Sequence, residues 1–120
     1  MTTDELLRAP QYSLPQPVKE TVLAGHLSDL TDHHRRNCPD YDRLIRILYP
    51  SFRGANELRA VPFIPVGLFK SHTLRSVPES EVFRTLLSSG TTGQQPSRIV
   101  LDRETARRQT LALSRIMTHV

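Results

Sequence analysis

Cysteine is nearly absent from this chain: Cys38 is the only one among 120 residues. A single cysteine cannot form an internal disulfide, so the chain is not a disulfide-stabilised secreted domain, and its thiol fits a reducing cytoplasm. Long apolar runs are also missing, since no stretch approaches the roughly 20 residues that a membrane-spanning helix needs. The N-terminal MTTDELLRAP is acidic and lacks an apolar segment, so we expect no secretory signal. We therefore expect a cytoplasmic protein with no membrane span.

Charge of one sign is not concentrated in any segment. The 16 basic and 12 acidic residues give a net charge of +4, and no block of five or six like charges occurs. The hydrophobic fraction of 38% and the charged fraction of 23% are typical of a soluble globular protein rather than a disordered one. A chain of this length is at most one domain with a modest core.

Two helices are predicted in the N-terminal half. Residues 9–17 contain three prolines and should be extended. Apolar residues then recur at a spacing of three to five, which predicts a helix with one apolar face that ends near Cys38. A shorter helix should begin with Asp40 as its N-cap and stop at Pro50. The apolar positions are Val18, Val22, Leu23, Leu27 and Leu30 in the first helix and Leu44, Ile45 and Leu48 in the second.

The C-terminal half predicts a strand, a loop, a second strand and a helix. Residues 59–70 contain two prolines three apart, which exclude a helix interior and predict an extended apolar segment. Residues 82–87 read as a strand, and the continuous apolar run 99–101 predicts a second strand covered on both faces. Asp102 is a suitable N-cap for a final helix, whose inner face should be Ala106, Leu113, Met117 and Val120. The expected fold class is therefore α/β.

The connection between the two strands carries the main functional signal. It reads SSGTTG and holds two of the chain's five glycines. The glycines allow positive φ and close approach to a ligand, successive backbone N–H groups can form an anion-binding nest, and the hydroxyl groups add short donors. The loop is not a Walker A loop, because the element after it is a strand. A flexible polar hairpin remains the alternative from spacing alone. The candidate phosphate-binding residues are Ser88, Ser89, Gly90, Thr91, Thr92 and Gly93.

The loop and its surroundings resemble a known family. SSGTTG followed by Pro96 resembles the phosphate loop of the adenylate-forming superfamily, [ST]-S-G-[ST]-T-G-x-P-K, except that Ser97 and then Arg98 stand where the superfamily has lysine. VPFIPVGLFKSH before the loop and SSGTTGQQPSRIVLDRET are similar to the acyl-protein synthetase branch, the LuxE-type enzymes. HHRRNCPDYDRLI has the character of the same branch. The resemblance covers the chain from about residue 26 onward.

The resemblance implies ATP-dependent activation of a long-chain fatty acid. A carboxylate would attack the α-phosphate to give an acyl-adenylate and pyrophosphate, and a protein cysteine thiol would then take the acyl group and pass it to a reductase partner. ATP and Mg²⁺ are the implied cofactors. Residues 88–93 would hold the β- and γ-phosphates, while Lys70 and Arg98 are cations without an assigned role.

Other equipment of that superfamily is not found in the chain. We identify no adenine-binding strand, ribose-binding aspartate, hinge or catalytic lysine, and the acceptor cysteine of the branch lies late in its full-length enzymes. Cys38 is therefore predicted to be a half-buried structural thiol. The final helix also reaches the last residue without a cap. Residues 1–120 are thus expected to form a single partial domain, the N-terminal portion of an adenylating domain, inactive on its own.

Three alternatives accompany this interpretation. A metal site could draw on the histidine and cysteine residues between positions 26 and 38, although their spacing is poor for four compact ligands. A basic nucleic-acid-binding module could use arginines of the final helix, but aromatic residues are few and no nucleic-acid motif occurs, so we expect no nucleic-acid partner. A non-catalytic remnant that binds a partner accepts the family and denies the activity. The residues concerned are His26, His33, His34, Cys38, Arg103, Arg107 and Arg108.

Overall fold

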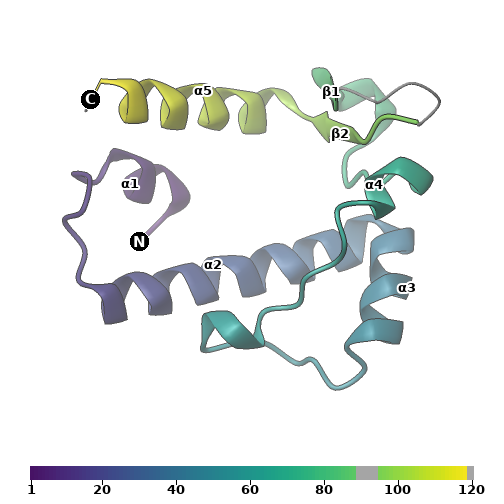
Figure 1. Ribbon diagram of the computed structural model, residues 1–120, viewed down its shortest axis with the longest axis horizontal. Coiled ribbons are helices and arrows are strands. Elements are labelled where there is room, and N and C mark those ends of the chain that lie inside the picture. The colour runs from purple at the N-terminus through teal and green to yellow at the C-terminus, as the bar shows by residue number, and fades with distance from the viewer. Residues whose placement is uncertain (89–94, 119–120) are drawn as a thin grey trace. The chain divides into compact units, whose positions relative to one another are not determined.

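The computed structural model describes residues 1–88 and 95–118. The chain divides into two units, Met1–Ile64 and Pro65–Val120. Helices and one two-stranded antiparallel sheet give the mixed α/β class that the sequence predicts (Figure 1). Within the described residues, no helix is long and apolar enough to cross a membrane.

The N-terminal unit consists of three α-helices and one short 3₁₀ helix. They are α1 (Thr3–Arg8), α2 (Gln16–Asn37), α3 (Pro39–Leu48) and η1 (Leu58–Ala60). The sequence pattern does not predict α1, although its start carries a capping box. The Thr2 hydroxyl accepts from the Glu5 N–H at 3.1 Å, and the Glu5 carboxylate accepts from the Thr2 N–H at 2.6 Å.

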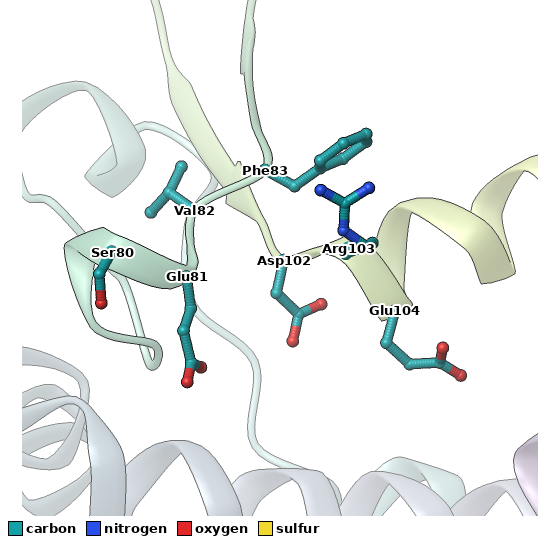
Figure 2. Close-up of a pocket in the computed structure, with 7 residues that line it drawn as sticks. All are labelled: Ser80, Glu81, Val82, Phe83, Asp102, Arg103 and Glu104. Atoms are coloured by element: carbon teal, nitrogen blue, oxygen red, sulfur yellow. The ribbon is translucent and has the colours of Figure 1, made fainter.

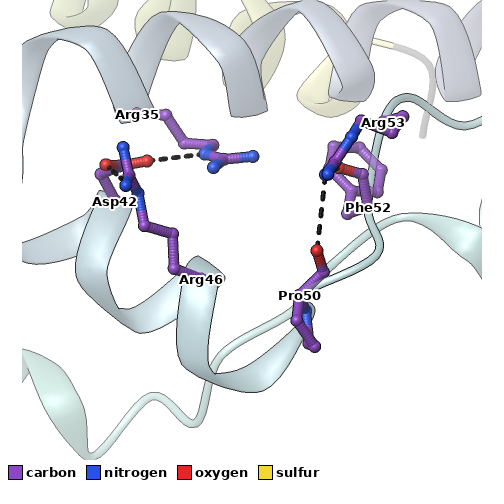
Figure 3. Close-up of polar contacts among 6 residues, drawn as sticks. All are labelled: Arg35, Asp42, Arg46, Pro50, Phe52 and Arg53. Carbon is purple, nitrogen blue, oxygen red and sulfur yellow. Dashed lines mark hydrogen bonds and ion pairs between the residues drawn. The ribbon is translucent and has the colours of Figure 1, made fainter.

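The corner between α2 and α3 lies where the sequence predicts it, but its cap is different. Cys38 is the N-cap of α3 and Pro39 is its first residue, so Asp40 falls inside the first turn instead of capping it. Proline favours this first position because its missing N–H has no helical partner there. Asp42 links the two helices through ion pairs: its Oδ1 lies 2.7 Å from Nε of Arg35 on α2, and its Oδ2 lies 2.8 Å from Nε of Arg46 on α3 (Figure 3). The hydrogen bond from Arg35 is the main cause that lowers the pKa of Asp42.

The core of the N-terminal unit lies between α2, α3 and η1, and small side chains of α2 face it. Ala24 and Thr31 are the buried residues of α2, and Ile45 is fully buried on α3. The prediction for the apolar face was wrong in part: Leu30 and Leu48 are each 49% exposed. α3 and η1 contact α2, and the buried residues of α2 are the small Ala24 and Thr31. Small residues permit a close approach of helices, which leaves larger neighbours outside the contact.

A loop of the N-terminal unit returns from α3 to α2. The Arg53 Nη1 donates to the Pro50 carbonyl at 3.4 Å, which braces the turn after α3 (Figure 3). Gly54 has φ +131°, a conformation that side-chain-bearing residues rarely adopt. The next N–H, that of Ala55, donates to the Ser28 hydroxyl of α2 at 3.1 Å. Gly54 therefore allows the chain to turn back onto α2.

The segment 59–70 is only partly extended, which corrects the sequence prediction. It contains the end of η1 and the start of α4 (Leu68–Ser71). Pro65 begins the turn that leads into α4, because its carbonyl accepts from the Leu68 N–H at 3.1 Å and proline tolerates the start of a helical turn. Upstream, the Tyr49 hydroxyl donates to the Phe63 carbonyl at 2.7 Å and accepts from the Phe63 N–H at 3.2 Å.

We predict that Tyr49→Phe lowers the free energy of unfolding by about 1 kcal/mol, because the substitution removes two hydrogen bonds and keeps the ring. Urea titration followed by circular dichroism measures the change. Tyr12→Phe is the matched control, since Tyr12 is 93% exposed. Equal effects of the two substitutions would show that the Tyr49 hydroxyl does not hold residue 63.

The C-terminal unit is built around a hairpin. It contains α4, η2 (Glu79–Glu81), β1 (Arg84–Leu87), β2 (Arg98–Leu101) and α5 (Arg103–Met117) (Figure 1). The strands pair antiparallel with Leu86 opposite Ile99. Asp102 caps α5 as predicted, because its Oδ1 accepts from the Thr105 N–H at 2.8 Å.

Two predictions about burial in this unit were wrong. On β2, Leu101 is 5% exposed but Ile99 is 38% exposed, so the strand is not covered on both faces. On α5, Leu113 is 62% and Met117 is 71% exposed, so they do not form an inner face, and Val120 lies outside the described residues. The reason is that, among the described residues, α4 and α5 are the elements with the main contacts to β2 beyond its hairpin partner, and neither covers the whole sheet.

Candidate functional site

The described structure fixes both ends of the predicted phosphate loop. The Ser88 N–H donates to the Ser97 carbonyl at 3.0 Å, and the Ser97 N–H donates to the Ser88 hydroxyl at 2.8 Å. The first bond extends the β1–β2 ladder by one step, and the second, to a side-chain hydroxyl, closes the neck of the hairpin. Ser97 is buried, while Ser88 is exposed.

Of the six predicted loop residues, the structure describes only Ser88. Ser88 belongs to the neck: its backbone N–H is occupied by Ser97, and its hydroxyl retains one hydrogen that can be donated to a ligand. The other five candidates lie outside the described residues, and their assignment stays a prediction. They are Ser89, Gly90, Thr91, Thr92 and Gly93.

Two of the predicted cations occur in elements that contact each other. Lys70 is exposed on α4, and Arg98 is exposed on β2 opposite Leu87. α4 contacts β2 within this unit. Neither side chain forms an ion pair with a described residue, so both are available to an anionic ligand.

Sequence reasoning missed a small acidic hollow beside the hairpin. It has a volume of about 380 Å³ and lies between η2, the start of β1 and the start of α5 (Figure 2). Its carboxylates come from Glu81, Asp102 and Glu104, and Arg103 borders it. The hydrogen bonds from Thr105 to its side chain hold the pKa of Asp102 below its ordinary value. Because Asp102 is engaged as a helix cap, we interpret this hollow as structural.

A second hollow, also missed, lies along α5. It has a volume of about 620 Å³ and is bordered by Phe83 and Arg84 on one side and by α5 on the other. Its lining combines apolar side chains with three arginines, Arg84, Arg103 and Arg107. A sequence signal for it existed, since arginines at 103 and 107 lie one helical turn apart and flank Ala106.

The structure does not assemble the histidines and the cysteine into a metal site. His26 Nε2 lies 2.9 Å from the Met1 carbonyl, and the His34 ring stands edge-on to Tyr41 with centroids 6.0 Å apart. Burial, with the neighbouring His33 as a second cause, lowers the pKa of His34. Cys38 is 3% exposed, which is more buried than the half-buried thiol predicted. Across residues 1–88 and 95–118, no group of three or more His, Cys, Asp or Glu side chains could hold a metal ion.

Comparison with known families bears on this site. The family model described as "Acyl-protein synthetase, LuxE" matches residues 2–120. The chain belongs to this family. No curated protein and no solved structure matches it. As a member of the LuxE family, the chain has a function of the acyl-protein synthetase type, and the family implies the use of ATP in general. The match includes the loop, its neck and both cations.

In this LuxE-family chain, we predict that Ser88→Ala destabilises the hairpin neck. The substitution leaves the N–H of buried Ser97 without its acceptor, which should cost about 1 to 2 kcal/mol. Urea unfolding measures the loss, and Ser88→Thr should restore most of the stability because it keeps a hydroxyl. Ser80→Ala, at an exposed position of the same unit, is the control. If Ser88→Ala leaves the free energy of unfolding unchanged, the Ser88 side chain does not stabilise the hairpin neck.

Proposed function

We propose that this chain takes part in the ATP-dependent activation of a long-chain fatty acid as an acyl-adenylate, with transfer of the acyl group to a protein cysteine thiol. The observation that carries the proposal is the LuxE family match, which spans the SSGTTG loop and the strands on both sides of it. The acceptor thiol would pass the acyl group to a reductase partner. The fatty acid, the acceptor and the partner are parts of this proposal.

The loop 88–93 is proposed to bind the β- and γ-phosphates. Its two glycines permit backbone conformations in which successive N–H groups converge on one anion. The closed neck supports this role, because the hydrogen bonds between Ser88 and Ser97 hold the two ends of the connection between β1 and β2 close together. With the Ser88 N–H already bonded to Ser97, the amide donors must come from the residues after it.

Lys70 and Arg98 are proposed to supply the positive charge that the usual lysine of the adenylate-forming superfamily would give. Arg98 follows Ser97 directly, at the end of the loop, and is exposed. A guanidinium group can bind a phosphate through two parallel N–H donors, which makes Arg98 the stronger candidate. Lys70 lies on the helix that contacts the same strand.

The reaction proposed is a displacement followed by an acyl transfer. A carboxylate oxygen of the acid bonds to the α-phosphorus as the bond to the pyrophosphate oxygen breaks. A thiolate then attacks the acyl carbonyl, and AMP leaves. The loop donors stabilise charge on the departing pyrophosphate. Mg²⁺ fits as a companion of the phosphates, since the described residues offer no cage of three ligands and Mg²⁺ commonly binds through substrate phosphates and one or two carboxylates.

Competition between phosphate ligands tests the loop assignment. We expect a fluorescent ATP analogue to bind the chain in the presence of Mg²⁺ and to be displaced by inorganic pyrophosphate but not by AMP, because the proposed contacts are to the β- and γ-phosphates. Fluorescence anisotropy measures the displacement. Displacement by AMP as effectively as by pyrophosphate, or the absence of saturable binding, would contradict the assignment. Steeply salt-dependent binding of duplex DNA instead would favour the nucleic-acid alternative.

A further inference from the structure

One face of α5 carries a seam of small and apolar side chains that is exposed over most of its length, Ala106 alone being half-buried. Ala106, Thr110, Leu113 and Met117 follow one another at intervals of four, three and four residues, so they form a single stripe along the helix. Leu113 is 62% exposed and Met117 is 71% exposed. The 4-3-4 spacing is the pattern by which one helix packs against another. From Ala106 to Met117 the seam extends about 16 Å along the axis, or three turns.

The small members of the seam allow a close approach. Ala106 and Thr110 line the hollow of about 620 Å³ beside the hairpin. The Thr110 hydroxyl donates to the Ala106 carbonyl at 3.1 Å, so this donor already has an acceptor and does not need water. A helix lying along the seam would therefore meet two small residues in the hollow and two large apolar residues beyond it.

The charged residues beside the seam indicate which kind of partner would bind there. The Arg103 guanidinium lies 4.5 Å from the centroid of the Phe83 ring, and that of Arg84 lies 5.7 Å from it. Figure 2 shows the Arg103 guanidinium facing the ring. Neither arginine forms an ion pair with a carboxylate in the described part of the chain. Glu81, Asp102 and Glu104 line the neighbouring hollow without an ion pair to Arg103. Two cations at one aromatic ring, neither paired with a carboxylate, favour an anionic group beside them, and arginine pairs with carboxylates through two parallel bonds.

These observations argue against a second copy of this chain as the occupant. Two α5 seams packed in parallel would juxtapose their arginines, which is destabilising, and an antiparallel pair would place them beside residues 113–118 of the other copy, which contain no carboxylate. A free inorganic anion would satisfy Arg84 and Arg103 but would leave Leu113 and Met117 uncovered. A small apolar molecule would be poorly enclosed, because ligand pockets bury most of their ligand and this face is open.

We propose that the α5 seam, together with Arg84 and Arg103, is a docking surface for an acidic amphipathic helix of a partner protein. Apolar residues of the partner helix would pack on Ala106, Thr110, Leu113 and Met117, and its flanking carboxylates would pair with the two arginines. This surface is distinct from the phosphate loop: Phe83 and Ser88 lie at opposite ends of β1. The proposal stands independently of the nucleotide assignment.

Two synthetic peptides test the surface. Each has 18 residues, leucines at 4-3-4 spacing and a fluorescent label, and they differ only in carrying glutamate or lysine at the flanking positions. We expect saturable anisotropy binding of the glutamate peptide and at least tenfold weaker binding of the lysine peptide. Arg103→Glu should reverse this preference while leaving the fold intact, because glutamate is favourable in the first turn of a helix. Equal affinity of the two peptides would overturn the proposal.

Apolar contacts are tested by a matched pair of exposed positions on α5. Leu113→Gln should weaken binding of the glutamate peptide about tenfold, whereas Ile116→Gln should not, since Ile116 is 54% exposed but lies off the seam. Equal losses of peptide affinity in the two variants would show that the peptide adsorbs nonspecifically to apolar side chains, and would contradict the proposal. Sedimentation showing a stable dimer of the chain, abolished by Leu113→Gln, would assign the seam to self-association and overturn the proposal. Gly90→Val should leave peptide binding unchanged, which separates this test from that of the phosphate loop.

Discussion

Gly90→Val is expected to abolish nucleotide binding, with a loss of about a hundredfold or more in affinity for the ATP analogue. A valine side chain disfavours positive φ, and its branched Cβ blocks the close approach of the backbone to phosphate oxygens. Thr92→Ala should weaken binding less, because it removes one hydroxyl donor and leaves the main chain unchanged. Fluorescence anisotropy with the ATP analogue and Mg²⁺ measures both effects. Fatty-acid-dependent exchange of labelled pyrophosphate into ATP should fall in parallel.

Gly67→Ala provides the matched glycine control in the same unit. A Cβ built at Gly67 meets no heavy atom within 4 Å, so the fold should tolerate alanine there. Its nucleotide affinity should therefore equal that of the parent chain. If Gly90→Val and Thr92→Ala both retain full nucleotide affinity and exchange, the loop has no part in the mechanism, whatever the family of the chain.

Ile45→Ala is expected to cost about 2 to 5 kcal/mol of unfolding free energy, the range for truncating a large buried aliphatic side chain. Ile45 is fully buried at the contact between α2 and α3. Small domains are stable by only about 5 to 15 kcal/mol, so this one substitution removes a large share of the total. Urea unfolding monitored by circular dichroism measures the loss, and partial unfolding in the absence of urea would agree with it.

Ile47→Ala is the control for this prediction because the two isoleucines share one helix. Ile47 is 75% exposed, so its truncation should change the unfolding free energy by about 0.5 kcal/mol or less. A similar cost at both positions would mean that the α2–α3 contact is not the core of the N-terminal unit. Since Ile45 belongs to Met1–Ile64, nucleotide binding measured on folded protein serves as an independent readout of the other unit.

Local sequence signals predicted much of the structure because their causes are local. Proline at position 39 and the apolar spacing before it predict the end of α2, which the structure places at Asn37. Asp102 was identified as the N-cap of α5 because a carboxylate before a helical run satisfies free N–H groups of its first turn. The cap of α3 was misjudged by two residues because Pro39 occupies the first helical position and moves the cap to Cys38.

Burial was predicted less well because it depends on which elements meet. The spacing of apolar residues on α5 predicts a buried inner face, yet Leu113 and Met117 are exposed, and no local feature of the sequence distinguishes the two outcomes. The hollow beside Phe83 likewise joins a residue before β1 to residues of α5, which are brought together by the hairpin. The hydrogen bonds between Ser88 and Ser97, nine residues apart, also arise only from the register of the strands.

By itself, the sequence determined the α/β class and the order of the main helices and strands, because helix caps and prolines act through the residues next to them; its resemblance to the LuxE-type enzymes indicated the family that the family model shows. Only the tertiary structure decided that Ser88 closes the hairpin neck, that Ala24 and Thr31 are the buried residues of α2, and that Arg84 and Arg103 share the Phe83 ring. Each of these contacts joins residues distant in the chain or selects one face of a helix. Such choices depend on the free energy of packing whole elements together, which a local pattern does not contain.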